Sequence, residues 1–226
     1  MKLKLLFSTL AFIGMVLLVS IFYLKSKTPS SFNAKAIAKK TTKVQEKSKP
    51  SSSSDSKILI AYFSRIGQQY AVGNIKEGNT AVIAKMIQQK VGGDLFEIKV
   101  AKDNYPTDSY TKLTEVGKSE QEKKARPKLA SKVENFDSYT TIFIGYPTWW
   151  GDKPMAVYTF IESYNFKGKT IVPFSTHEGT GFCGTRGMES LGAKLLKGIG
   201  IYGHVAQNER AEAKKLVLAW LKEIGF

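Results

Sequence analysis

Three short segments of this sequence combine residue types that can hold a phosphate group and a flat ring. The first runs from Ser64 to Thr80 and carries hydroxyl groups, three glycines and a final Asn-Thr pair. The second, Pro147 to Gly151, contains two adjacent tryptophans, which can stack on a planar heterocycle. The third, Ser-Thr-His-Glu-Gly-Thr-Gly-Phe at residues 175–182, has glycines that let backbone amides approach a ligand closely. Together they predict a site for a mononucleotide with a flat heterocycle.

Each of these segments follows an apolar run with the composition of a parallel strand. The runs are residues 57–63, 139–145 and 169–174. Near-continuous apolar runs of this length indicate strands that are covered on both faces. Ligands of open α/β sheets bind outside the carboxyl ends of the strands. We therefore expect the three segments to meet at one edge of a sheet.

The Asn79-Thr80 pair opens an amphipathic segment that Gly92-Gly93 ends, which predicts a helix after the first segment. The amide groups and the dipole of a helix amino terminus form an anion site. An ordinary capped helix is the alternative, because the segment matches neither the GxGxxG pattern nor the Walker lysine pattern.

Strands and helices alternate through the rest of the chain. Besides the runs above, strands are expected at residues 95–100 and 199–205, and helices at residues 79–91, 109–124, 155–164, 188–197 and 208–224. The inward residues of the last helix are expected to be Ala211, Leu216, Ala219 and Trp220. This alternation predicts an α/β fold with a parallel sheet and right-handed crossovers.

The first 56 residues lack the composition of a folded domain. An apolar run from Leu5 to Leu24 would extend about 30 Å as a helix, enough to span a bilayer. We expect residues 1–24 to be an uncleaved membrane anchor rather than a cleaved signal segment, because the small-residue pattern at 34–36 lies well past the run. Residues 25–56, rich in Lys and Ser, are expected to be a disordered linker, and residues 57–226 one domain.

Two features of the sequence give opposite indications of the side of the membrane on which the domain lies. The count of flanking lysines slightly favours a cytoplasmic domain, whereas a short basic start before an apolar run is typical of a signal-anchor with exported bulk. We expect the domain to be exported to the cell surface.

Charge and cysteine content exclude some kinds of site. The formal net charge is +15, of which the first 57 residues contribute +9 (eleven lysines less two acidic residues) and the rest +6. This positive charge suits binding to anionic lipid or polymer. No basic helix carries base-reading residues, so nucleic acid is not an expected partner.

Cys183 is the only cysteine, so no intramolecular disulfide can form. One cysteine with two histidines makes a poor zinc site, and no metal is expected.

The folded part resembles the flavodoxin superfamily, in particular its membrane-anchored or cytosolic bacterial FMN proteins. The resemblance covers about Lys57 to Phe226. It rests on these segments in this order: Ala61-Tyr-Phe-Ser64, Gly78-Asn-Thr80, Ala125-Arg-Pro127, Gly145-Tyr-Pro-Thr-Trp-Trp-Gly151 with Pro154, Thr159-Phe-Ile-Glu162, and Gly168-Lys-Thr-Ile-Val-Pro-Phe-Ser-Thr-His177.

This resemblance implies a flavodoxin-like three-layer sandwich with a five-stranded parallel sheet in the order 2-1-3-4-5, and noncovalent FMN at the strand carboxyl ends. The phosphate would be bound by Ser64, Asn79 and Thr80. One tryptophan would flank the isoalloxazine ring, beside a loop of Pro147, Thr148, Trp149, Trp150 and Gly151. The opposite loop would be formed by Ser175, Thr176, His177 and Gly179.

The function implied by the resemblance is an FMN-binding electron carrier tethered to the membrane. An FMN-dependent NAD(P)H:quinone or flavin reductase shares fold and cofactor, but needs room over the ring for the hydride donor. A third alternative is a surface-tethered binding module with a degenerate flavin site. Flavodoxins are usually strongly acidic whereas this domain is basic, so its redox partner protein is expected to be acidic or membrane-bound.

Four single residues have open interpretations. His177 is either a loop hydrogen-bonding residue or a proton donor, and His204 is expected to be structural. Cys183 is expected to be a small packing residue rather than a redox thiol. The carboxylate of Glu178 would disfavour the anionic reduced form of a flavin if it points toward the ring.

Overall fold

The computed structural model describes residues 57–226. Among these residues, no helix is both long and apolar enough to cross a membrane. The expected anchor at residues 1–24 and the expected linker at residues 25–56 lie outside the described residues.

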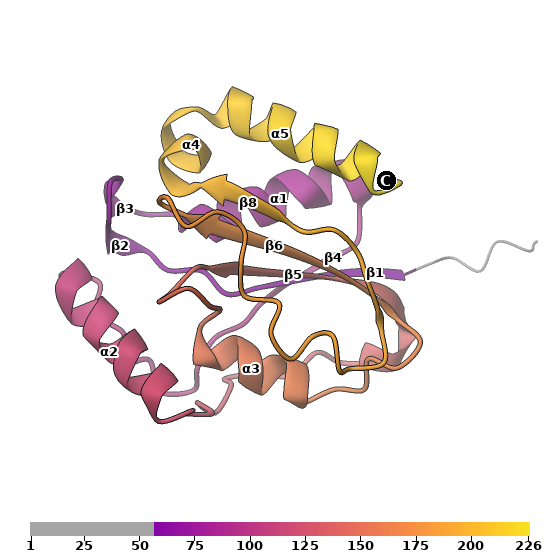
Figure 1. Ribbon diagram of the computed structural model, residues 1–226, viewed down its shortest axis with the longest axis horizontal. Helices are drawn as coiled ribbons and strands as arrows, with labels where there is room; N and C mark the ends of the chain where they lie inside the picture. The colour runs from indigo at the N-terminus through magenta and orange to yellow at the C-terminus, as the bar shows by residue number, and fades with distance from the viewer. Residues whose placement is uncertain (1–56) are drawn as a thin grey trace, which may run out of the picture. The chain divides into compact units, whose positions relative to one another are not determined.

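A parallel sheet lies at the centre of the domain (Figure 1). Its strands are β1 (Lys57–Tyr62), β4 (Asp94–Glu97), β5 (Tyr139–Pro147), β6 (Thr170–His177), β7 (Lys194–Leu195) and β8 (Ile199–Tyr202). They lie in the order β4-β1-β5-β6, and the short strands β7 and β8 both pair with β6. The predicted order 2-1-3-4-5 is therefore confirmed, with the fifth position shared by two short strands.

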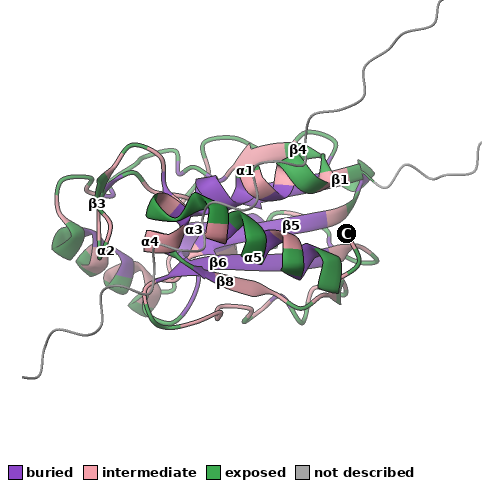
Figure 2. Cartoon of the chain, turned by 90° about the horizontal axis from the view of Figure 1, so that it is seen from above, coloured by how far each residue is buried: buried purple, intermediate pink, exposed green. Residues whose placement is uncertain are grey.

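Helices cover both faces of this sheet (Figure 1). One face carries α1 (Asn79–Val91), α4 (Gly203–Asn208) and α5 (Arg210–Glu223), and the other carries α2 (Tyr110–Glu122), α3 (Met155–Glu162) and the short 3-10 helix η1 (Phe136–Ser138). Two apolar cores result, one on each side of the sheet. Strands β5 and β6 are buried along most of their length (Figure 2) because both cores pack against them. The flavodoxin-like α/β fold predicted from the sequence is confirmed.

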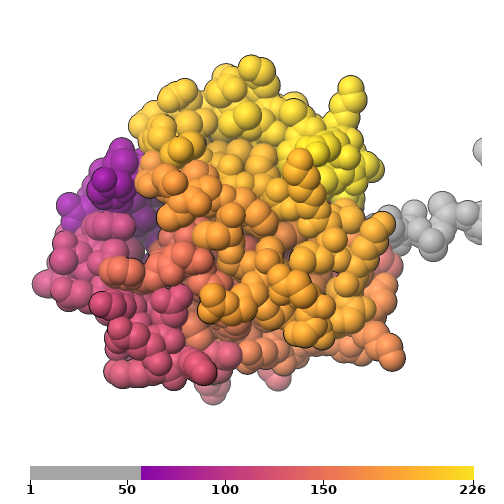
Figure 3. All heavy atoms as spheres, viewed as in Figure 1, coloured from indigo at the N-terminus to yellow at the C-terminus, as the bar shows by residue number. Residues whose placement is uncertain are grey.

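The segment between β1 and α1 is not the plain loop that the sequence predicted. It contains a two-stranded antiparallel sheet, β2 (Gly67–Gln69) and β3 (Gly73–Ile75), which we call the hairpin. The hairpin lies beside α2 (Figures 1 and 3). Its Gln68 amide donates to the Thr107 carbonyl at 2.7 Å. A Cβ atom at Gly67 would lie 2.2 Å from that oxygen, so the contact requires glycine at this position.

The prediction of a helix at residues 188–197 is wrong. Gly187 and Gly192 have φ angles of 82° and 70°, which a right-handed helix cannot include, and only four residues separate them. Lys194 and Leu195 instead extend the sheet edge as β7. The expected strand at residues 199–205 is too long, because Gly203 begins α4 and His204 lies on that helix.

The inward face of α5 was also predicted wrongly. The buried residues are Ala213, Val217, Trp220 and Leu221, which share one face of a helix by their spacing of three and four residues. Leu216 is exposed, and of the expected set only Trp220 is buried. The buried stripe includes Ala213, whose small side chain gives a weak hydrophobic signal in the sequence.

Candidate functional site

The three predicted segments meet at the carboxyl edge of the sheet. The hydroxyl oxygens of Thr80, on α1, and Thr176, on β6, lie 2.8 Å apart and share a buried hydrogen bond. The amide of Thr148, which follows β5, donates to the Thr176 carbonyl at 2.8 Å. Thr176 therefore connects the third segment to both of the others.

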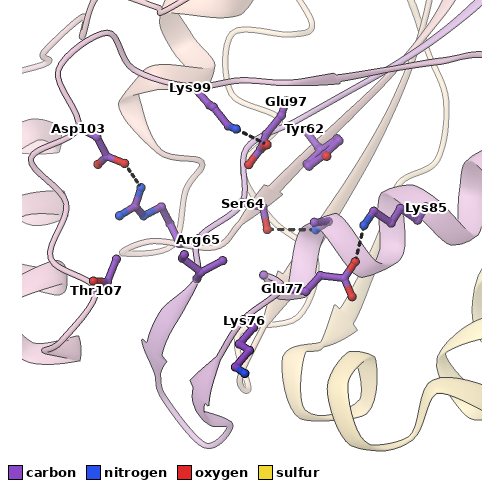
Figure 4. A pocket seen from close by; sticks show the side chains of 13 residues that line it. Tyr62, Ser64, Arg65, Lys76, Glu77, Lys85, Glu97, Lys99, Asp103 and Thr107 are labelled. Carbon is purple, nitrogen blue, oxygen red and sulfur yellow. Dashed lines mark hydrogen bonds and ion pairs between the residues drawn. The ribbon is translucent and has the colours of Figure 1, made fainter.

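The amino terminus of α1 is closed by a side chain from the end of β1. The Ala81 amide donates to Oγ of Ser64 at 3.0 Å (Figure 4). A Cβ atom at Gly78 would lie 2.2 Å from that Oγ, so glycine allows this approach. The amides of Asn79 and Thr80 precede Val82, whose amide donates to the Gly78 carbonyl, and they have no acceptor within the helix. They are the groups that could receive a phosphate oxygen.

The side chains predicted to bind phosphate already have protein partners. Besides the bonds of Ser64 and Thr80, Oδ1 of Asn79 accepts from Nε2 of Gln207 on α4 at 3.0 Å. Gly203 at the start of α4 approaches this carboxamide so closely that a Cβ there would lie 2.2 Å from the amide nitrogen. An anion could therefore bind the backbone amides at the start of α1. The side chains of Ser64, Asn79 and Thr80 hold that backbone in place.

A cavity of about 640 Å³ lies next to this helix terminus, on the β4 side (Figure 4). Most charged groups on its wall pair with one another. Nη1 of Arg65 lies 2.5 Å from Asp103, Nζ of Lys85 lies 2.6 Å from Glu77, and Nζ of Lys99 lies 2.8 Å from Glu97. The pairs reduce the attraction of this cavity for an external anion.

The two tryptophans occupy a tight turn. The Trp149 and Asp152 backbones exchange hydrogen bonds of 2.8 and 3.0 Å. Trp150 and Gly151 between them have φ angles of 51° and 75°, as in a type I′ turn. A positive φ is costly for a bulky residue such as Trp150.

This turn sends the two indole rings into different surroundings. Trp149 packs edge-on against Phe63 and Tyr105, with ring centroids 5.5 and 5.4 Å away. Trp150 is 54% exposed, and its Nε1 donates to the Thr114 carbonyl on α2 at 2.9 Å. Trp149 therefore packs against the core, and Trp150 is the more exposed of the two.

A second cavity, of about 400 Å³, opens at this turn, and we call it the ring pocket. Segments from four parts of the chain form its wall: Tyr70, Tyr110, Leu113, Thr114, Thr148, Trp149, Trp150, Gly151, Glu178 and Thr180. The volume lies within the usual range for small-molecule sites, and aromatic groups on such a wall suit a planar ring.

His177 organises the third segment and is the last residue of β6. Its Nδ1 accepts from the amides of Gly179 and Gly181 at 3.1 and 3.3 Å. Burial lowers the pKa of His177 below its ordinary value, and the two accepted bonds require the neutral ring. This geometry favours the loop hydrogen-bonding interpretation of His177.

Glu178 connects the ring pocket to α4. Oε1 accepts from the His204 amide and Oε2 lies beside His204 Nδ1, both at 2.7 Å. The carboxylate thus closes the start of α4 and engages the imidazole of His204, which has the expected structural role.

A buried polar cluster fixes the end of the third segment against the tryptophan turn. Nζ of Lys153 donates to the carbonyls of Gly184 and Arg186 at 3.2 and 2.5 Å, and lies 3.5 Å from Asp152. Burial lowers the pKa of Lys153 to about 8. Tyr158 donates to Asp152 at 2.8 Å. The cluster holds the end of the third segment against the tryptophan turn.

The remaining predicted site residues contribute in different ways. Pro147 ends β5, and Ser175 is fully buried in β6 with no hydrogen-bond partner for Oγ among the described residues. Cys183 has its sulfur 3.6 Å from Oγ1 of Thr148, consistent with a packing role. Within residues 57–226, no group of His, Cys, Asp and Glu side chains could hold a metal ion.

Sequence reasoning missed several residues that line the ring pocket. Tyr70 lies between the two strands of the hairpin, Tyr110 opens a polar helix, and Thr180 was noted only as part of its loop. The available signal was a tyrosine between Gly67 and Gly73, because a large aromatic residue exposed on a turn often marks a binding site.

Comparisons with known proteins agree with this fold. A family model described as Flavodoxin matches residues 57–223. A putative flavoprotein from Bacteroides eggerthii is 31% identical, with a TM-score of 0.57, over 76% of this chain and 99% of that one. A putative flavoprotein from Bacteroides uniformis is 30% identical, with a TM-score of 0.54, over 72% of this chain and 97% of that one.

A third structure shares the fold at lower identity. It is a flavoprotein from Lactobacillus acidophilus solved in complex with FMN, 18% identical, with a TM-score of 0.50, over 69% of this chain and 99% of that one. No curated protein matches this chain.

Proposed function

Because the chain belongs to the flavodoxin family, we propose that it binds FMN noncovalently and transfers electrons while tethered to a membrane. One observation carries the proposal: the open amino terminus of α1 and the aromatic ring pocket lie at the same edge of the sheet, joined through Thr80, Thr176 and Thr148. A phosphate and a flat ring are the two ends of FMN.

The chain's own residues have distinct roles in this proposal. The amides of Asn79 and Thr80 bind the phosphate, and Ser64 fixes their orientation. Trp150 flanks the ring, and the loop held by His177 presents its backbone on the other side of the pocket. A bound flavin would supply the redox chemistry, while the protein sets the environment of the ring.

The amino-terminal segment and the charge of the domain suggest the setting. The apolar run Leu5–Leu24 is long enough to anchor the chain, with the domain exported. Its net charge of +6 beyond residue 57 (+15 less +9) favours an acidic redox partner protein or one in the anionic membrane surface.

The test is a visible absorption spectrum of the full-length chain, purified in mild detergent, after FMN is added and the excess removed. Anaerobic addition of NADH and NADPH follows. We expect a bound-flavin spectrum that neither nucleotide bleaches. Rapid bleaching would replace the carrier with the reductase alternative, and a colourless protein would leave the binding module.

A further inference from the structure

We propose that the hairpin is a ligand-binding element, and that Tyr70 stacks on the planar ring in the ring pocket on the side away from Trp150. This inference rests on the proposed binding of FMN. It adds a residue of the hairpin, between β1 and α1, to the binding site.

Tyr70 and Trp150 are both supported by α2. The Tyr70 ring lies 5.7 Å from the ring of Tyr110, at an angle of 32°. The indole Nε1 of Trp150 donates a hydrogen bond to the carbonyl of Thr114, which lies four residues after Tyr110 on the same helix. Four residues of a helix span about 6 Å. Tyr70 and Trp150 are therefore held by the same helix about one turn apart, and both line the ring pocket. A planar ring in contact with both side chains would need them about 7 Å apart.

Both aromatic side chains also have more free surface than a packing role requires. Tyr70 is 60% exposed and Trp150 is 54% exposed, although both line the same cavity. Backbone strain lies at both positions, with positive φ at Trp150 and at Ala71, next to Tyr70. Exposed aromatic groups on strained turns are costly unless a ligand covers them.

The hairpin is fixed well enough to place Tyr70. Besides the bond from Gln68 to Thr107, Oε1 of Gln68 accepts from the Tyr110 amide at 3.1 Å. The strand carrying these contacts ends at Gln69, directly before Tyr70. The position of Tyr70 is therefore set by the start of α2 and by Thr107, which precedes that helix.

The experiment compares FMN with riboflavin, which has the same ring and no phosphate. Dissociation constants are measured by quenching of flavin fluorescence for the full-length wild type, Tyr70→Ala, Tyr70→Phe and Asn74→Ala. Asn74 lies on the other strand of the hairpin and does not line the ring pocket, so it serves as the control.

We expect Tyr70→Ala to raise both dissociation constants by the same factor, about tenfold, as for the loss of one stacked aromatic group. Tyr70→Phe and Asn74→Ala should bind both ligands as the wild type does. A Tyr70→Ala protein with unchanged affinities, or with weaker binding of FMN alone, would overturn the inference. A wild type that binds neither ligand would instead overturn the proposed function.

Discussion

At the scale of single residues, the two adjacent tryptophans have opposite roles, and substitutions can separate them. Trp149→Ala removes a ring packed against Phe63 and Tyr105. It should lower the free energy of unfolding by about 2–4 kcal/mol, as for other large-to-small core changes. Trp150→Gly relieves a positive φ and removes an exposed ring. It should change the unfolding free energy by less than about 1 kcal/mol and weaken flavin binding about tenfold.

Urea unfolding and fluorescence quenching measure the two effects on the same samples. Loss of stability in Trp150→Gly with intact flavin binding would contradict the assigned roles.

His177 should make the domain sensitive to mild acid. Burial lowers the pKa of His177, so the unfolded chain takes up a proton near pH 6.5 that the folded protein resists. The stability contributed by the neutral ring is present above about 6.5 and is lost as the pH falls through the lower folded pKa. Urea unfolding at pH 7.5 and 5.5 should show that the wild type loses more unfolding free energy on acidification than His177→Asn does. Equal losses in the two proteins would contradict this role of His177.

At the scale of elements, the sequence predicted the four principal strands and most of the helices, because long apolar runs and amphipathic periodicity identify them. It did not predict the hairpin, where short strands have little side-chain signal. It also placed a helix at residues 188–197, where Met188 and Leu191 mimic a helical pattern although the backbone turns at Gly187 and Gly192. Backbone conformation at glycine depends on packing that one sequence does not display.

The candidate site was predictable to a similar extent. The positions of Thr80, Thr176 and Trp150 at one edge follow from parallel strands that end together. That Trp149 turns inward and Trp150 outward depends on a type I′ turn with an unusual tryptophan at its first central position. The contribution of Tyr70 depends on how the hairpin docks on α2.

Two glycines of the hairpin offer a matched test of that docking. Gly67 and Gly73 have φ angles of 88° and 85°, so alanine is equally strained at both. Only at Gly67 does a Cβ meet another atom, the Thr107 carbonyl at 2.2 Å. Gly67→Ala should therefore weaken riboflavin binding severalfold more than Gly73→Ala, measured by fluorescence quenching. Equal effects would show that the hairpin does not need its contact with Thr107 to form the ring pocket.

At the scale of the whole molecule, the proposed tethering rests on the apolar run near the amino terminus. When the full-length chain is expressed in bacterial cells, we expect it to stay with the membrane fraction after an alkaline carbonate wash, because a run of this length can span the bilayer. A chain lacking residues 1–24 should appear in the soluble fraction. Release of the full-length chain by the wash would contradict the anchor, and protease digestion of intact cells would report the side on which the domain lies.

The central claim is that the carboxyl edge of the sheet binds FMN, and the absorption spectrum of the full-length chain tests it most directly. After FMN is added and the excess removed, the protein should retain the flavin with a spectrum altered by its aromatic neighbours, and neither NADH nor NADPH should bleach it. A protein that retains no flavin at all would contradict the account.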